Sequence, residues 1–270
     1  MRIGSRDFAT TGHTYIMGIL NVTPDSFSDG GKFNQIDAAL KHAEEMIRDG
    51  ADVIDIGGES TRPWGYTKIS DEEETGRVVP VIEAVKKEFG IPISVDTYKS
   101  GVAEAAAQAG ADLINDIWGL KYDPHMSEVI AKSGLACCLM HNRDNTEYRN
   151  FMEDVKQDLR ETIVLAKAAK IADDKIILDP GVGFAKSYEN NLEVIRRLKE
   201  FNELKYPVLL GTSRKSVIGL TLDLPAAERV EGTIVTTVMA VEAGCMFVRV
   251  HDVKENHRAI QMAEAILDRK

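Results

Sequence analysis

The sequence has no apolar run long enough to cross a membrane and no cluster of basic residues. No uninterrupted apolar stretch reaches about 18 residues, the length that a membrane span needs. Lysine and arginine number 33 against 43 aspartate and glutamate residues, which gives a formal net charge of −10. A basic face for nucleic acid is therefore not expected. The ligands that we expect are small molecules, with any anion met by a few local cations and backbone amides.

Two further absences concern the cellular compartment. The first residues, MRIGSRDFATTGHTY, lack the apolar central region of a signal peptide, so we expect a cytoplasmic protein. Cysteine is scarce: Cys137, Cys138 and Cys245 lie in apolar runs, with no neighbouring Cys or His at zinc-ligand spacing. Adjacent cysteines rarely form a disulfide with each other. We therefore expect three buried, reduced thiols, as in a reducing cytosol.

The sequence also lacks any linker, low-complexity segment or shift in composition that would divide it. Of its 270 residues, 44% are hydrophobic and 28% are charged, which is the composition of a globular protein rather than a disordered one. Single-domain α/β barrels commonly have about 250 residues. We therefore expect residues 1–270 to form one domain.

Short apolar runs alternate with amphipathic stretches along the whole chain. The runs are rich in Val and Ile and are mostly apolar on successive residues, which is typical of strands buried on both faces of a parallel sheet. The predicted strands are 15–22, 52–56, 92–95, 112–117, 135–140, 176–178, 207–210 and 245–250.

Helical spacing of three and four between apolar residues fills the intervals. The predicted helices are 36–47, 71–89, 100–109, 125–133, 151–171, 191–201, 226–243 and 254–267. Eight strand–helix units in about 250 residues predict a (β/α)8 TIM barrel. The alternative is a doubly wound open sheet, but it typically has fewer strands, and no GxGxxG motif follows the first strand here. Residues 2–12 are expected to form a small β-ribbon that caps the floor of the barrel.

Every predicted strand is followed by polar or charged residues. In barrels of this type the chemistry takes place at the carboxyl ends of the strands. A single strand-end Asp can simply cap the next helix, but the same feature at all eight strands favours a functional site. The residues at these ends are Asn21, Asp55, Asp96, Asn115, His141, Asp179, Ser213, Lys215, Arg249 and His251.

These strand ends belong to long motifs that occur in a fixed order. They are GILNVTPDSFSDGG at 18–31, DIGGESTRP at 55–63, SVDT at 94–97, DPGVGFAK at 179–186, GTSRK at 211–215 and RVHD at 249–252, and Asn115 and Asp116 lie in the fourth predicted strand. Together the motifs resemble the signatures of the dihydropteroate synthases over nearly the full length. The segment after His141, NRDNTEYRN, differs from the MQG-type segments of other family members.

The resemblance implies a transferase of folate synthesis. The family joins 6-hydroxymethyl-7,8-dihydropterin diphosphate to p-aminobenzoate and releases diphosphate, in an SN1-like reaction with Mg²⁺ as cofactor. A carboxylate that accepts two N–H groups and a cation that donates to an oxygen can bind the pterin edge. The resemblance assigns the pterin site to Asp96, Asn115, Asp179, Phe184, Lys215 and Arg249, with the planar guanidinium of Arg249 against the ring.

The resemblance also implies a site for the diphosphate and one for the aryl amine. Asn21 matches the magnesium ligand of the family, since a neutral oxygen donor suits a hard cation already held by phosphates. Thr61, Arg62, Arg249 and His251 are expected to contact the phosphates. Two long polar segments, 23–33 and 61–69, are expected to act as mobile lids. Phe27, Pro63, Ser213 and Lys215 are expected to line the p-aminobenzoate pocket, where sulfonamides would bind in its place.

Three alternatives to this function remain open at the level of sequence. A corrinoid-dependent methyltransferase could use a related barrel, although it would not need the VTPDSFSDGG loop or the Arg62–Pro63 pair. A Schiff-base aldolase could use Lys215, if the charge of Arg214 lowered its pKa. A barrel without activity could serve as a binding module, but it would lack site residues.

The family commonly forms homodimers. The predicted helix at 226–243 is apolar on more than one face and could contact both the barrel and a second copy. The apolar residues concerned are Ile234, Val235, Val238, Met239 and Val241.

Overall fold

The computed structural model describes residues 1–23, 32–60 and 68–269. In these residues eight parallel strands form one sheet in the order β8-β7-β6-β5-β4-β3-β10-β9. The strands are β3 (Tyr15–Asn21), β4 (Val53–Gly57), β5 (Ile93–Asp96), β6 (Leu113–Asp116), β7 (Ala136–Met140), β8 (Ile176–Asp179), β9 (Leu209–Leu210) and β10 (Phe247–Val250).

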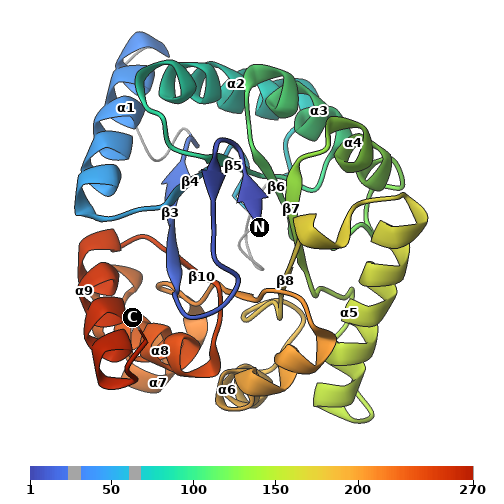
Figure 1. Ribbon diagram of the computed structural model, residues 1–270, viewed down its shortest axis with the longest axis vertical. Helices are drawn as coiled ribbons and strands as arrows, with labels where there is room; N and C mark the ends of the chain where they lie inside the picture. Colours follow the sequence, from blue (N-terminus) through green and yellow to red (C-terminus); the bar gives the residue numbers. More distant parts are fainter. Residues whose placement is uncertain (24–31, 61–67, 270) are drawn as a thin grey trace.

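The sheet closes into a barrel through its two end strands. Within the described chain, one parallel bridge between Leu178 of β8 and Val208, next to β9, joins them. The amide of Leu178 donates to the carbonyl of Pro207 at 2.9 Å. The helices surround this ring of strands (Figure 1). The predicted (β/α)8 barrel is therefore confirmed, with strand bounds within three residues of those expected.

In the described chain one helix follows each strand of the sheet except β9, which is followed by two. They are α1 (Lys32–Asp49), α2 (Asp71–Glu88), α3 (Ser100–Ala109), α4 (Met126–Ser133), α5 (Phe151–Ala168), α6 (Tyr188–Arg196), α7 (Ser216–Leu222), α8 (Val230–Ala243) and α9 (Val253–Ile266). Short 3₁₀ turns occur at η2 (Asp173–Lys175), η3 (Leu198–Leu204) and η4 (Ala226–Glu228). Of the helices in the ranges given above, none is long and apolar enough to cross a membrane.

The helices differ from the predicted ones in detail, and the helix expected at 226–243 begins with the 3₁₀ turn η4 before α8. The helix expected at 191–201 is α6, which ends at Arg196, and a separate 3₁₀ turn follows it from Leu198. Helix α7 was not predicted at all. It has seven residues, SVIGLTL, which include a glycine and three β-branched side chains, so neither length nor propensity marks it as a helix. Burial of Val217 and Ile218 stabilises it instead.

The expected β-ribbon is present at the amino end of the barrel. Strands β1 (Arg2–Ile3) and β2 (Arg6–Asp7) pair antiparallel, and the ribbon lies over the centre of the ring in Figure 1. Ile3 and Phe8 are buried in one cluster with inward-facing residues of the strands, among them Met17, Val53 and Phe247. The ribbon therefore fills the barrel floor with apolar side chains, as predicted.

The three cysteines are buried and form no disulfide, as expected from their apolar surroundings. Burial raises the pKa of each thiol. These residues are core side chains, and we assign them no chemical role.

Candidate active site

The alternation of side-chain direction along each strand places the residues of the site directly above the apolar floor. Side chains at alternate positions of a strand point to the same face. On β4, Val53 belongs to the floor cluster and Asp55 is the next inward residue, while Ile54 and Ile56 pack outward under the helices. On β6, β8, β9 and β10 the residue two positions beyond the floor is likewise the next inward one. The resulting inward pairs are Leu113 and Asn115, Ile177 and Asp179, Leu209 and Gly211, and Phe247 and Arg249.

Strand register then places several polar residues at one level. Asn21 is aligned with Gly57, Gly57 with Asp96, and Asp96 with Asn115 across four neighbouring strands. A Cβ at Gly57 would lie 3.7 Å from Oδ1 of Asn21 and 3.8 Å from Oδ2 of Asp96. Asn21 is exposed and Asp96 is buried, so this side of the barrel mouth is polar from its interior to its rim.

Arg249 binds two buried carboxylates at the centre of the mouth. Its Nε donates to Oδ2 of Asp55 at 2.6 Å, and its Nη2 donates to Oδ2 of Asp96 at 2.7 Å. Burial alone would lower the pKa of Arg249, but the two carboxylates outweigh burial and raise it. Burial raises the pKa of Asp96 to about 7, against the opposing effect of Arg249. The three groups form one coupled charge cluster.

The Asp55–Arg249 contact was missed by the sequence analysis, which noted Asp55 only as a strand-end residue. Asp55 also accepts a weak hydrogen bond from Nδ2 of Asn115 at 3.4 Å. Oδ1 of Asp55 and Oδ1 of Asp96 are buried and have no hydrogen-bond partner among the described residues. Unsatisfied buried acceptors are costly, so these atoms are suited to donors from a ligand.

Asp179 and Lys215 form the second charged pair of the mouth. A Cβ at Gly211 would lie 3.7 Å from Oδ2 of Asp179 and 3.8 Å from Nζ of Lys215, so both side chains face the same glycine. Burial raises the pKa of Asp179, and the nearby ammonium of Lys215 partly offsets this effect. Burial lowers the pKa of Lys215 to about 8, although Asp179 raises it. Arg214, the cation that we considered as the cause, instead pairs with Asp252.

The loop that follows β8 organises this pair. The amide of Gly181 donates to Oδ1 of Asp179 at 2.7 Å, and Nζ of Lys215 donates to the carbonyl of Val182 at 2.7 Å. The ring of Phe184 lies under Lys215, 4.7 Å from Nζ to the ring centroid. Gly181 has a φ of +70°, and a Cβ there would lie 2.0 Å from the carbonyl oxygen of His141. Only glycine fits this close contact with β7.

Ser213 and His251 meet at the β9 and β10 side of the mouth. Oγ of Ser213 and Nδ1 of His251 are 2.9 Å apart, and the amide of His251 donates to Ser213 Oγ at 3.1 Å. The structure therefore brings together most of the site residues expected from sequence in two neighbouring groups. Four expected residues, Phe27, Thr61, Arg62 and Pro63, lie outside the described residues, as do most of the two expected lid segments.

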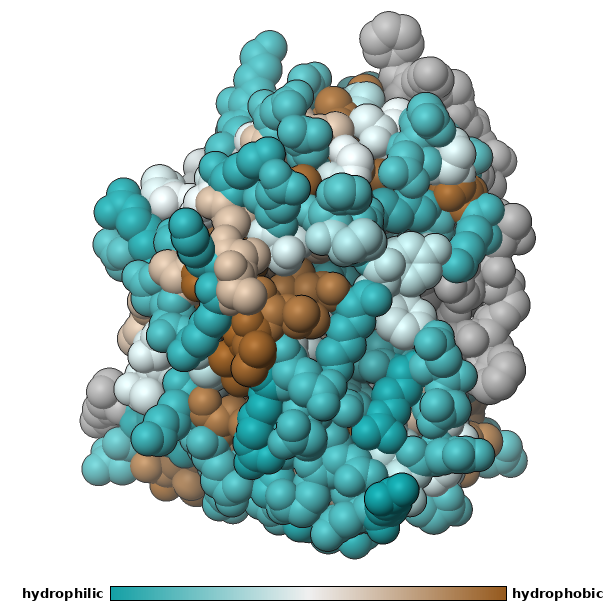
Figure 2. Space-filling model, turned by 90° about the vertical axis from the view of Figure 1, so that its right-hand side faces the viewer, coloured by the Kyte–Doolittle hydropathy of each residue, from teal (hydrophilic) through white to brown (hydrophobic). Residues whose placement is uncertain are grey.

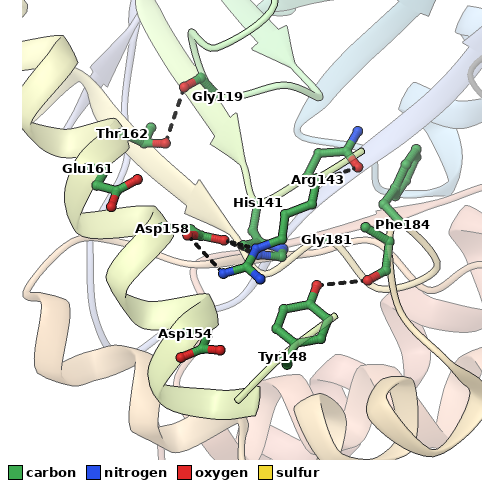
Figure 3. Close-up of polar contacts among 12 residues, drawn as sticks. Gly119, His141, Arg143, Tyr148, Asp154, Asp158, Glu161, Thr162, Gly181 and Phe184 are labelled. Atoms are coloured by element: carbon green, nitrogen blue, oxygen red, sulfur yellow. Dashed lines mark hydrogen bonds and ion pairs between the residues drawn. The ribbon is translucent and has the colours of Figure 1, made fainter. Parts of the chain in front are cut away.

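Sequence reasoning also missed a polar cluster directly behind the β8 loop. His141, directly after β7, Asp158 of α5 and Lys186 are joined by hydrogen bonds. Figure 3 shows His141 and Arg143 pointing toward Asp158, and Tyr148 pointing toward the loop at Phe184. In the sequence, Asp158 is one of several acidic residues of an amphipathic helix, and no local signal distinguishes it.

The chain is similar to known proteins over its whole length. The family model of pterin-binding enzymes matches residues 17–251. The dihydropteroate synthase of Clostridium beijerinckii is 62% identical over 270 residues, covering 100% of both chains. A Clostridium difficile dihydropteroate synthase, solved in the presence of pteroic acid, superposes with a TM-score of 0.93 at 52% identity and covers 100% of both chains. A Yersinia pestis dihydropteroate synthase, solved with a sulfonamide drug, gives a TM-score of 0.93 at 42% identity over 99% of both chains.

The barrel, its polar mouth and the family match define a pterin-binding enzyme. Within that class the chain belongs to the dihydropteroate synthases, which are transferases of folate synthesis. This membership favours the first function that the sequence suggested over a corrinoid methyltransferase, an aldolase or a barrel without activity.

Proposed function

We propose that this chain joins 6-hydroxymethyl-7,8-dihydropterin diphosphate to p-aminobenzoate at the carboxyl end of its barrel. The observation that carries the proposal is the pairing of a buried carboxylate, Asp179, with a buried cation, Lys215, around Gly211. The pterin edge has two N–H donors next to a carbonyl oxygen. A carboxylate and an ammonium side by side match that pattern of donors and acceptor.

The remaining pterin contacts would come from the neighbouring strands. Oδ1 of Asp96 has no partner in the described part of the chain, and Asn115 lies beside it in register. Both side chains would complete the hydrogen bonds of the ring. Phe184 would provide an apolar wall. Arg249 is held by Asp55 and Asp96, which fixes the plane of its guanidinium, and a planar cation of this kind can stack on a flat ring.

The diphosphate would lie at the rim, where Asn21, His251 and Arg249 face the mouth. Among residues 1–23, 32–60 and 68–269, no three His, Cys, Asp or Glu side chains form a metal-binding group. The single exposed amide oxygen of Asn21 suits Mg²⁺ held mainly by substrate phosphates, because this ion binds few protein ligands and prefers oxygen. Mg²⁺ bound there would neutralise charge on the leaving diphosphate. Thr61 and Arg62 are proposed as further diphosphate contacts from the sequence alone.

The chain's own residues support an SN1-like course. The bond between the pterin methylene carbon and the diphosphate oxygen breaks, and its electron pair leaves with diphosphate. Asp96 and Asp179 then stabilise the cation delocalised over the pterin ring, while His251 and Arg249 hold the leaving group. The amine of p-aminobenzoate forms the new carbon–nitrogen bond and loses a proton. Phe27, Pro63 and Ser213 are the proposed contacts of p-aminobenzoate and of the sulfonamides that would compete with it.

The proposal is tested by turnover with the pterin diphosphate and p-aminobenzoate. We expect 7,8-dihydropteroate and diphosphate to form, activity to be lost on adding EDTA, and added Mg²⁺ to restore it. A sulfonamide should inhibit in competition with p-aminobenzoate. Absence of product from the folded protein with Mg²⁺ present would refute the function, and full activity in EDTA would refute only the metal requirement.

We also propose that the protein is a homodimer formed through α7, α8 and α9. Helix α8 buries Thr233, Thr236 and Thr237 against the barrel and exposes Val235 and Val238 to solvent. Exposed valines are not what a solvent-facing helix prefers. Neighbouring α7 and α9 expose further apolar side chains. They are Leu220, Leu222, Met262, Ile266 and Leu267.

The face that carries α5 differs from this surface. Figure 2 shows it as mainly hydrophilic around one apolar patch, and the exposed large hydrophobic residues of α5 are Val164 and Leu165. More of the exposed large hydrophobic residues lie at α7, α8 and α9 than at α5, and exposed apolar side chains that gather on one surface favour a protein interface.

The dimer prediction can be checked with a matched pair of variants. Val235 is 60% exposed on α8 and Val164 is 65% exposed on α5. A buried charge without a partner weakens an interface strongly, so Val235→Glu is expected to produce monomers, whereas Val164→Glu should stay dimeric. Light scattering at micromolar concentration measures both. A monomeric wild-type protein, or the same effect of both variants, would contradict the prediction.

A further inference from the structure

Lys186 is a buried lysine whose ammonium group donates hydrogen bonds to the loop after β8, on the side away from Lys215. Its Nζ lies 2.8 Å from Nδ1 of His141, 2.9 Å from the carbonyl oxygen of Gly181 and 3.1 Å from that of Phe184. An ammonium has three N–H donors and no acceptor. The three acceptors therefore use the full hydrogen-bonding capacity of the charged form.

His141 is held in the state that accepts this bond. Its Nε2 lies 2.9 Å from Oδ2 of Asp158, a carboxylate that only accepts. The proton of a neutral imidazole therefore lies on Nε2, and Nδ1 is free to accept from Lys186. Burial, followed by the charge of Lys186, lowers the pKa of His141 to about 4. The geometry and the charge distribution agree on a neutral imidazole between an ammonium and a carboxylate.

Asp158 is fixed in turn by Arg143. Nε and Nη2 of Arg143 donate to the two oxygens of Asp158 at 2.5 and 3.1 Å, and Figure 3 shows the three side chains converging. Hydrogen bonds from His141 and Arg143 outweigh burial and lower the pKa of Asp158. Tyr148 lies beneath the Arg143 guanidinium, and its hydroxyl donates to the carbonyl of Ala185 at 2.7 Å. The cluster thus contacts the β8 loop at three carbonyls, those of Gly181, Phe184 and Ala185.

On its opposite side, the same loop contacts Asp179 and Lys215, the two residues proposed to bind the pterin edge. Gly181 accepts from Lys186 through its carbonyl and donates to Asp179 through its amide. Val182 accepts from Lys215, and Phe184 presents its ring to Lys215 while its carbonyl accepts from Lys186. A shift of this loop would therefore move the acceptor and the donor proposed for the pterin edge together.

We propose that Lys186, oriented by His141 and Asp158, is a positioning residue for pterin binding. It acts through the carbonyls of Gly181 and Phe184 and does not contact the substrate. The inference rests on the proposed pterin site at Asp179 and Lys215. The charged groups that face Lys186 are Asp179 from β8, Lys215 from the loop after β9, Arg143 from the loop after β7 and Asp158 from α5. Burial lowers the pKa of Lys186 to about 7, the two carboxylates raise it, and the other two cations lower it.

The first test replaces the lysine. Lys186→Met removes all three hydrogen bonds but keeps an unbranched side chain of similar length. We expect the KM for the pterin diphosphate to rise at least about tenfold, as for the loss of a charge-assisted hydrogen bond, with the KM for p-aminobenzoate changed less than about twofold. Lys132→Met is the control, because Lys132 is an exposed residue of α4. Circular dichroism and the melting temperature establish that each variant is folded at the assay temperature.

The second test uses two substitutions of equal size at His141. In His141→Asn, the amide oxygen can take the place of Nδ1 and accept from Lys186, whereas His141→Leu leaves that donor without a partner. Both variants lose the bond to Asp158. We expect the asparagine variant to keep pterin affinity within about threefold of wild type and the leucine variant to lose about tenfold. A purely steric role of His141 would give the two variants the same pterin affinity.

The outcomes separate this inference from the proposed function. Calorimetry with the pterin diphosphate is run on the wild type first, and absence of binding there refutes the proposed function. If the wild type binds and Lys186→Met binds equally well, the positioning role is wrong and the pterin site stands. Equal losses in both His141 variants would also overturn it.

Discussion

Asp179→Asn is expected to reduce pterin affinity at least about tenfold with the fold retained. Oδ1 of Asp179 already accepts from the amide of Gly181, so the amide oxygen of asparagine must take that position. The amide nitrogen then faces the pterin at the position of Oδ2, where the ring presents an N–H group. Two donors meet without an acceptor between them, which costs about 1–3 kcal/mol in a buried site. Calorimetry with the pterin diphosphate measures the loss directly.

Asp112→Asn provides the control for this change. Asp112 is also buried, but it lies at the amino end of the barrel, where it pairs with Lys86 and accepts from the amide of Ile93. Its substitution should lower stability and leave pterin affinity unchanged. Equal affinities of the Asp179 variant and the wild type would exclude Asp179 as the pterin anchor.

Arg249→Met is expected to have the largest effect on stability. The variant leaves Asp55 and Asp96, both buried, without their shared cation. Removal of one partner from a buried ion pair costs about 3–5 kcal/mol. Urea unfolding measures this loss. Arg197→Met is a suitable control, because Arg197 also pairs with two carboxylates, Glu193 and Glu200, but on the surface, where such pairs contribute about 1 kcal/mol or less.

The effect of Arg249→Met should depend on pH in a defined direction. The pKa of Asp96 is already raised to about 7 in the folded protein, so its contribution to stability is present below the unfolded pKa and is lost as pH rises through the folded pKa. Without Arg249 this pKa rises further, and the variant should lose more stability at about pH 8 than at about pH 5. Adding Asp55→Asn and Asp96→Asn should recover most of the loss. A loss that is independent of pH would contradict this account.

The barrel and the location of its site could be predicted from sequence because both depend on local patterns. Apolar runs of three to eight residues define the strands, and the polar residue that ends each run, such as Asp179, marks the edge where the carboxyl ends meet. The inward direction of Asp55 and Arg249 also follows from alternation with the floor residues Val53 and Phe247. The family motifs added the substrates, which no periodic pattern contains.

The partners of these residues could not be predicted, because they depend on tertiary distances. Asp55 and Arg249 are 194 positions apart, and their contact requires a closed ring with the observed register. Lys186 is the last residue of the recognisable motif DPGVGFAK, but its contact with His141 depends on Gly181 packing directly against the end of β7. Helix α7 is stabilised by burial rather than by its own sequence pattern. In each case local sequence gives the residue and the fold selects its partner.

The closure of the barrel between β8 and β9 has a consequence for the coupling of folding and binding. In the described chain this seam has one bridge, at Leu178 and Val208, whereas β3 and β4 are aligned over five residue pairs. Asp179 ends the strand on one side of the seam, and Lys215 follows the strand on the other. A pterin held by both residues would link the two sides as a non-covalent staple. A ligand that binds only the folded state stabilises it by an amount that grows with the ratio of ligand concentration to Kd. The substrate would therefore strengthen the barrel where its own backbone hydrogen bonds are fewest.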